Sequence, residues 1–146
     1  MFRTVVALTA LTSTAAVTLA IATSGGAQTP EETVLSYNVR DIGGTFVDSR
    51  PKGDSRGDFV AFEAHLLTGG RIVGKERGTC IVANADKHLP LCTMGWLLSD
   101  GTLTTVGPTA ADPPFTMPIA GGTGRFAGAR GTALVGTKSV TFRLLP

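Results

Sequence analysis

The sequence lacks the basic cluster that indicates nucleic-acid binding, and it lacks the apolar periodicity that indicates helices. The thirteen Lys and Arg residues are spread along the chain and form no cluster with interleaved aromatic residues, which a nucleic-acid-binding surface needs. No window carries a sustained helical stripe of apolar residues, and the stretch 79–89, which is free of Gly and Pro, is interrupted by Asn84, Asp86 and Lys87. We therefore expect no nucleic-acid partner and no helical fold.

Signatures of metal, nucleotide and hydrolase sites are missing as well. Cys80, His88 and Cys92 lack the fourth ligand and the spacing of a zinc site. The segment 122–127 superficially resembles a dinucleotide fingerprint, but no βαβ unit surrounds it and no acidic residue follows it. No Ser occupies a Gly-x-Ser-x-Gly elbow. We expect neither a metal nor a cofactor.

The N-terminus has the pattern of an export signal. Arg3 precedes the uncharged run from Val5 to Ala22, and small residues follow as far as Ala27. We predict that residues 1–27 are a signal peptide, that residues 28–146 form one domain, and that the mature protein is secreted and leaves the membrane. The alternative is an uncleaved membrane anchor, although a run of about 18 residues rich in Thr is marginal for spanning a bilayer.

The composition of the rest of the chain favours short strands joined by turns. The sequence holds 19 Gly and 8 Pro, with many Thr and Val. Asp100-Gly101 predicts a two-residue type I′ hairpin, because both central residues of that turn need positive φ. The strands that we expect are Thr33 to Val39, Thr45 to Val47, Asp58 to Leu67, Arg71 to Val82, Leu91 to Leu98, Thr102 to Val106, Phe115 to Ile119, Thr132 to Val135 and Ser139 to Leu144.

Eight or nine short strands form either a sandwich or a closed barrel, and both alternatives fit these residues. An eight-stranded barrel has an interior that is filled by side chains or is wide enough for one small ligand.

The two cysteines are placed symmetrically about a turn. Cys80 and Cys92 flank the turn-forming run 84–90. If the flanking strands pair antiparallel about residue 86, the cysteines lie opposite each other at a distance that suits a disulfide. Export would preserve such a bond. The alternative is a free thiol at Cys80 in a cavity.

From Gly57 onward the sequence resembles the allene oxide cyclase and dirigent proteins. The blocks that carry the resemblance are Gly57-Asp58-Phe59-Val60-Ala61-Phe62, Leu66-Leu67-Thr68-Gly69, Gly78-Thr79-Cys80-Ile81-Val82, 101–108 and, above all, 119–131, which contains Gly-Gly-Thr-Gly followed by Ala-Arg-Gly. The resemblance implies an all-β, eight-stranded antiparallel closed barrel that assembles as a homotrimer.

The resemblance also implies site residues. The plant cyclases use a cavity Glu, Asn, Ser and Cys; Asn38 and Cys80 match the Asn and the Cys, and are the catalytic residues implied here. Ser36 replaces the Glu and Gly44 replaces the Ser, so the carboxylate of the plant reaction is lost.

Dirigent proteins position their ligand with acidic residues and an Arg. This comparison adds Asp41 and Arg130 to Ser36 as implied ligand-binding residues, whereas Arg125 occupies the place of a dirigent acid. For Asp41 and Arg130 the alternative is a salt bridge or a contact that stabilises a turn.

These observations lead to one hypothesis and one alternative. The hypothesis is a secreted barrel that binds a small apolar or phenolic molecule and acts as a cofactor-free cyclase or as a guide of a reactive intermediate. The alternative is a secreted, non-catalytic binding or structural module whose interior is filled by side chains.

Overall fold

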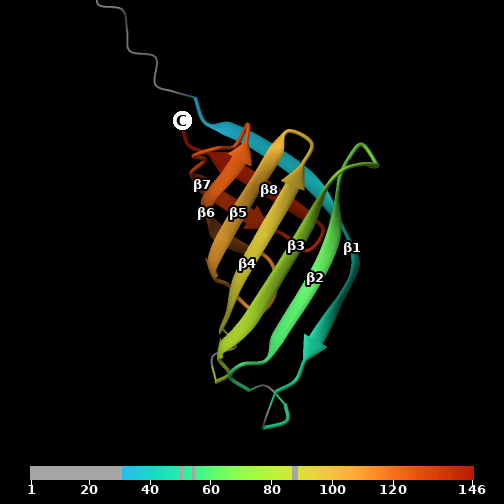
Figure 1. The fold of residues 1–146 in the computed structure, drawn as a ribbon, viewed down its shortest axis with the longest axis vertical. Coiled ribbons are helices and arrows are strands. Elements are labelled where there is room, and N and C mark those ends of the chain that lie inside the picture. Colours follow the sequence, from blue (N-terminus) through green and yellow to red (C-terminus); the bar gives the residue numbers. More distant parts are fainter. Residues whose placement is uncertain (1–30, 50, 54, 87–88) are drawn as a thin grey trace, which may run out of the picture.

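Eight antiparallel strands close into a barrel, in which each strand pairs with the next along the chain and the last pairs with the first (Figure 1). The computed structural model of the protein describes residues 31–49, 51–53, 55–86 and 89–146. The strands are β1 (Thr33–Val47), β2 (Phe59–Thr68), β3 (Arg71–Asn84), β4 (Leu89–Leu98), β5 (Gly101–Pro108), β6 (Phe115–Gly124), β7 (Gly131–Val135) and β8 (Ser139–Leu144). The closed barrel that the resemblance implied is confirmed, and the sandwich is excluded.

The expected signal peptide, residues 1–27, and its cleavage site lie outside the described residues. Within the ranges that the structure describes, no helix is long and apolar enough to cross a membrane.

The first strand differs most from the expectation. Residues 33–39 and 45–47 belong to one strand, and no turn forms at Gly43-Gly44. The ladder with β2 shifts between Asp41 and Gly43, so Ile42 forms a β-bulge that lets the strand continue. Gly44 then lies so close to β2 that a Cβ atom there would stand 2.8 Å from the carbonyl oxygen of Ala61. The glycine pair therefore marks a bulge and a close approach of two backbones.

The hairpin between β4 and β5 is confirmed, but its turn lies one residue earlier than expected. Leu98 pairs with Gly101, so Ser99 and Asp100 are the two turn residues. Gly101 is the first residue of β5 and has a φ of 154°.

One half of the barrel interior is filled by closely packed side chains. Trp96 and Phe142 meet edge to face with ring centroids 5.1 Å apart. The indole Nε1 of Trp96 donates a buried hydrogen bond to Thr105 Oγ1 at 3.1 Å, so the polar atom of this large side chain is satisfied. Around this pair pack the fully buried side chains of Leu66, Leu103, Met117, Ala133 and Val140.

The disulfide predicted from the spacing of the cysteines is present. Cys80 and Cys92 are directly opposite on β3 and β4, with Cα atoms 4.0 Å apart, and their sulfurs are bonded. The alternative of a free thiol at Cys80 is therefore wrong.

Replacing both cysteines with Ala will lower the free energy of unfolding by about 3 kcal/mol, because the bridge restricts the unfolded chain over the intervening loop. The measurement is urea denaturation of both proteins without reductant. Thr79 and Thr93 form the adjacent cross-strand pair on the same two strands and point outward. The double variant Thr79→Ala/Thr93→Ala is the matched control, and an equal loss in both variants would contradict a specific contribution of the bridge.

Candidate functional site

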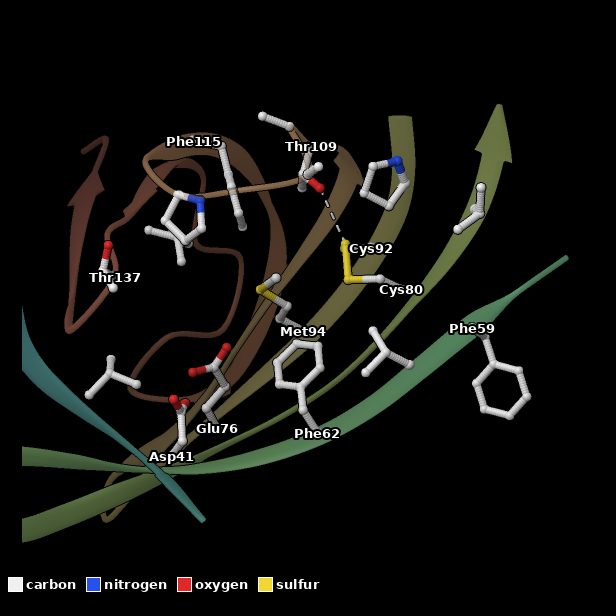
Figure 2. A pocket seen from close by; sticks show the side chains of 18 of the residues that line it. Asp41, Phe59, Phe62, Glu76, Cys80, Cys92, Met94, Thr109, Phe115 and Thr137 are labelled. Carbon is white, nitrogen blue, oxygen red and sulfur yellow. Dashed lines mark hydrogen bonds between the residues drawn. A yellow bond between two sulfur atoms is a disulfide. The ribbon is translucent and has the colours of Figure 1, made fainter. Parts of the chain in front are cut away.

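The other half of the barrel contains a cavity of about 560 Å³. It lies at the end where the connections β1–β2, β3–β4, β5–β6 and β7–β8 meet, which is the lower end of the barrel in Figure 1. Its lining includes side chains from β1, β2, β3, β4, β6 and β7 and from the loop after β5, among them Val39, Asp41, Phe62, Glu76, Cys80, Met94, Thr109, Phe115, Val135 and Thr137 (Figure 2).

The walls of the cavity are mainly apolar, and two glycines make room for them. Phe62 on β2 pairs with Gly44 on β1 and with Gly78 on β3. A Cβ atom at Gly78 would stand 2.5 Å from the Phe62 ring, so the ring lies directly against the backbone of β3. Because Gly78 has no side chain, the Phe62 ring occupies the space above it and forms part of the cavity wall.

Two carboxyl groups, from the buried Glu76 and the more exposed Asp41, lie together in the cavity. Asp41 on β1 and Glu76 on β3 are both cross-strand partners of Ala64 on β2, so the three residues form one layer across the sheet. Because side chains in one layer point to the same face, the methyl group of Ala64 leaves space for the two longer side chains above it. Figure 2 shows both carboxyl groups in the same part of the cavity.

The position of Glu76 changes its acidity. Its residue is only 5% exposed, and its partner on the next strand is the buried Trp96, where the packed half of the barrel begins. Burial, reinforced by the negative charge of Asp41, raises the pKa of Glu76 to about 7. A carboxyl group with this pKa can donate or accept a proton at neutral pH, which is the property that general acid–base chemistry requires.

A third cavity carboxylate, Asp58, has a structural task. Its oxygens accept hydrogen bonds from the backbone N–H groups of Ser49 at 2.6 Å and Ser55 at 2.8 Å, and from the Ser55 hydroxyl at 2.9 Å. The backbone bond from Ser55 is the main cause of a lowered pKa of Asp58. The backbone of Asp58 also pairs with Val82 on β3. Asp58 therefore fixes the connection between β1 and β2 at the cavity mouth.

The disulfide forms another part of the wall. The Thr109 hydroxyl donates a hydrogen bond to Cys92 Sγ at 3.4 Å (Figure 2). The Thr109 N–H donates to the carbonyl oxygen of Pro90 at 3.0 Å. These contacts hold the start of the β5–β6 connection over the cavity.

The structure separates the site residues that the resemblance implied. Asp41 and Cys80 line the cavity, but the sulfur of Cys80 is engaged in the disulfide. Ser36 and Asn38 are exposed on the outer face of β1, while the alternate residues Tyr37 and Val39 pack toward the core. The resemblance to the plant cyclases implied a cavity position for Asn38, and this placement is wrong because Asn38 lies on the outside. Ser36 donates to or accepts from Thr141 on the outside, with the two hydroxyl oxygens 3.0 Å apart.

Arg130 lies at the opposite end of the barrel from Asp41. It is exposed in the connection between β6 and β7, next to the C-terminal residues, and its carbonyl oxygen accepts a bond from Leu145 N–H at 2.9 Å. The two residues therefore do not share the cavity. Arg125, in the same connection, forms an ion pair with Asp100 at 2.9 Å.

Glu76 is the main residue that the sequence analysis missed. The signal was available, because side chains alternate along a strand and Glu76 shares the face of Cys80 through Gly78. Phe62, Met94 and Phe115 gave no such signal, since apolar residues on an inward face fit a filled barrel equally well.

The raised pKa of Glu76 has a consequence for stability. The folded state keeps the Glu76 proton up to about pH 7, whereas the unfolded chain releases it near pH 4.5. The folded state therefore binds more protons between these values, and wild-type stability falls as the pH rises through this window. Glu76→Gln will be more stable than the wild type by up to about 3 kcal/mol at about pH 8, and the gain will vanish near pH 4. Urea denaturation across this pH range measures the difference.

Glu63 on β2 provides the control for this experiment. Its outward carboxylate lies 3.3 Å from Arg77 and 3.4 Å from Lys75. Partial burial raises its pKa, but the hydrogen bonds and charges of Arg77 and Lys75 outweigh this effect and lower it overall. Glu63→Gln should therefore give no gain at high pH. Equal behaviour of the two variants would contradict the buried, raised state of Glu76.

Comparisons with known proteins agree with this architecture. Residues 42–144 match the family described as dirigent-like proteins. The solved structure of a pyocyanin demethylase is similar with a TM-score of 0.70 and 26% identity, covering 77% of this chain and 99% of that one. A pterocarpan synthase dirigent protein has a TM-score of 0.61 and 23% identity, covering 78% and 83% of the two chains.

A Diels–Alderase from Streptomyces koyangensis has a TM-score of 0.53 and 15% identity over 80% of this chain and 69% of that one, which shows the shared fold alone. No curated protein matches this sequence. The family match covers seven of the eight strands completely and the end of the first. The chain therefore belongs to the dirigent-like protein family.

Proposed function

We propose that this protein binds a small, mainly apolar and aromatic molecule inside the barrel and holds its polar part against Asp41 and Glu76. One observation carries this proposal: half of the barrel is hollow, and a carboxyl pair, the buried Glu76 with the more exposed Asp41, lies among the apolar walls of the hollow half. The volume of about 560 Å³ lies within the range of small-molecule sites, which is roughly 300–1,000 Å³. The alternative of a barrel filled by side chains throughout does not fit this interior.

The carboxyl pair supports a role in guiding a reaction. Glu76 can give a proton to a bound intermediate or take one from it near neutral pH, while the charge of Asp41 can stabilise positive charge that develops nearby. The similar solved structures include proteins that are named for demethylation of pyocyanin, pterocarpan synthesis and Diels–Alder chemistry. Guidance of a cyclisation or isomerisation by confinement and proton transfer is the reaction class that fits this site best.

Secretion is part of the proposal. The disulfide between Cys80 and Cys92 supports it, because such bonds persist in oxidising compartments.

Binding in the cavity is tested with N-phenyl-1-naphthylamine, a neutral dye that fluoresces in apolar surroundings. We expect uptake of about one dye per chain, since the cavity has room for one ligand of this size. Val60 points into the cavity, so Val60→Trp will fill part of it and weaken binding by about tenfold or more.

Leu134→Trp is the control, because Leu134 is 48% exposed on the outside of β7. Loss of dye binding in both variants, or no uptake by the folded wild type, would count against an open binding cavity.

A homotrimer is a further part of the proposal. An apolar row crosses the outer face of five strands through the successive partners Val47, Phe59, Ile81, Leu91 and Pro108. Ile81 and Leu91 are 51% and 48% exposed, and a contiguous exposed row of this kind is typical of a contact between proteins.

Ile81→Glu/Leu91→Glu will convert a trimer to a monomer, because the carboxylates would be desolvated in the interface. Native mass spectrometry or light scattering of the wild type and of this variant measures the change. Leu134→Glu on the outside of β7 is the control and should remain trimeric. A monomeric wild type would refute this part of the proposal and leave the binding cavity unaffected.

A further inference from the structure

We propose that the cavity selects planar aromatic cations, such as N-alkylated or protonated nitrogen heterocycles, and discriminates against aromatic carboxylic acids. This inference rests on the proposed function and specifies the chemical class of the ligand. The arrangement of charge in the cavity carries it.

All the charged side chains among the described lining residues are acidic. They are Asp41, Asp58 and Glu76, and no Lys, Arg or His from the described part of the chain lines the cavity. Asp58 is occupied by its three hydrogen-bond donors from Ser49 and Ser55. The negative charge that is free to act on a ligand therefore belongs to Asp41 and Glu76, which lie on strands at the inner end of the cavity.

Within the described part of the chain, Glu76 has no partner that would satisfy its charge. Its residue is 95% buried and lines the cavity. Burial and the charge of Asp41 act on its carboxyl group, and no hydrogen bond from a described residue offsets them. Asp41 on β1 is the charged group that faces it, while its neighbours on β2 and β4 are Ala64 and Trp96. A buried carboxylate without a donor or a cation is unfavourable, so Glu76 holds its proton until a positive group arrives.

A cationic ligand can replace that proton. When the cation binds beside Asp41 and Glu76, the Glu76 O–H bond breaks, the proton leaves to solvent, and the positive charge of the ligand takes over its neutralising role. The net charge of the site is unchanged by this exchange. A neutral ligand leaves the proton in place, and a carboxylate ligand would add a negative charge next to the pair.

The apolar walls favour a flat cation over a compact one. Phe62 and Phe115 present aromatic rings to the cavity, which Met94 also lines, and the Phe62 ring is drawn beside the carboxyl pair (Figure 2). Aromatic faces attract positive charge, most strongly where water is excluded. A heteroaromatic cation can therefore contact these side chains with its ring and place its charged nitrogen toward the carboxyl groups.

Three probes of nearly the same shape separate charge from size. They are 1-methylquinolinium, 1-methylnaphthalene and 1-naphthoate, which are positive, neutral and negative. Calorimetric titration of the intact protein at about pH 8 should show 1-methylquinolinium binding about tenfold more tightly than 1-methylnaphthalene, and 1-naphthoate binding most weakly, because a close charge pair changes affinity by at least this factor.

The pH dependence provides a second readout. Since Glu76 is protonated below its pKa of about 7, cation affinity should fall by up to about tenfold per pH unit below that value, and each bound cation should release up to one proton. The affinity for 1-methylnaphthalene should not change. Proton release is measured by repeating the titration in buffers that differ in ionisation enthalpy.

Variants assign the preference to the carboxyl pair. Glu76→Gln and Asp41→Asn should each reduce the preference for the cation over the neutral probe and preserve binding of 1-methylnaphthalene, which also verifies that the cavity is intact. Glu63→Gln on the outer face is the matched control and should keep the full preference.

The outcomes separate this inference from the proposed function. Equal affinities of the cation and the neutral probe, or tighter binding of 1-naphthoate, would overturn the selection of cations and leave a binding cavity in place. A preference that survives in both Glu76→Gln and Asp41→Asn would also overturn it. Binding of none of the three probes would overturn the proposed function together with the inference.

Discussion

The site depends on the register of the closed barrel. Each strand pairs with both neighbours, so the inward side chains of successive strands are arranged in layers. One such layer contains Asp41, Ala64, Glu76, Trp96 and Leu103. Ala64 is small enough for the two acids to approach each other, and Trp96 begins the packed half. A slip of one residue in the β2–β3 pairing would turn Glu76 outward and leave the cavity without the pair.

The hollow half of the barrel lacks the apolar packing that stabilises the other half, and the structure offsets this at the open end. The Cys80–Cys92 bridge joins β3 to β4 in the cavity wall, and Asp58 fastens the β1–β2 connection to β3 through Val82. Both features tie separate segments of the backbone together at the cavity wall, and neither fills the interior. Rigidity at the mouth can therefore coexist with an unfilled cavity, as a preorganised binding site requires.

The sequence predicted the strands better than the site. β8 has the predicted bounds, and the cysteine spacing located the pairing of β3 with β4, because both depend on local patterns. The bulge at Ile42 was not predicted, because the pair Gly43-Gly44 fits a turn between two strands equally well. Asn38 and Arg130 were implied by a resemblance, but strand alternation places Asn38 outside and the order of the strands places Arg130 at the far end. The inward position of Glu76 could have been predicted, because it lies four residues before Cys80 on the same face of the strand. Its proximity to Asp41 could not, because it depends on the pairing of both residues with Ala64.

Glu76 lowers the stability of the fold at neutral pH, and this loss of stability argues that the residue has a functional role. A buried carboxyl group beside a second acid destabilises the fold at neutral pH, and a barrel under selection for stability alone would carry an apolar or amide side chain in this layer. The three solved structures compared above share the fold at 15–26% identity and are named for different reactions, so the fold does not fix the chemistry. What can differ between such barrels is the set of side chains in the inward layers. In this chain that set places an acid of neutral pKa at the inner end of an apolar cavity, and the specificity of the protein should follow from that position.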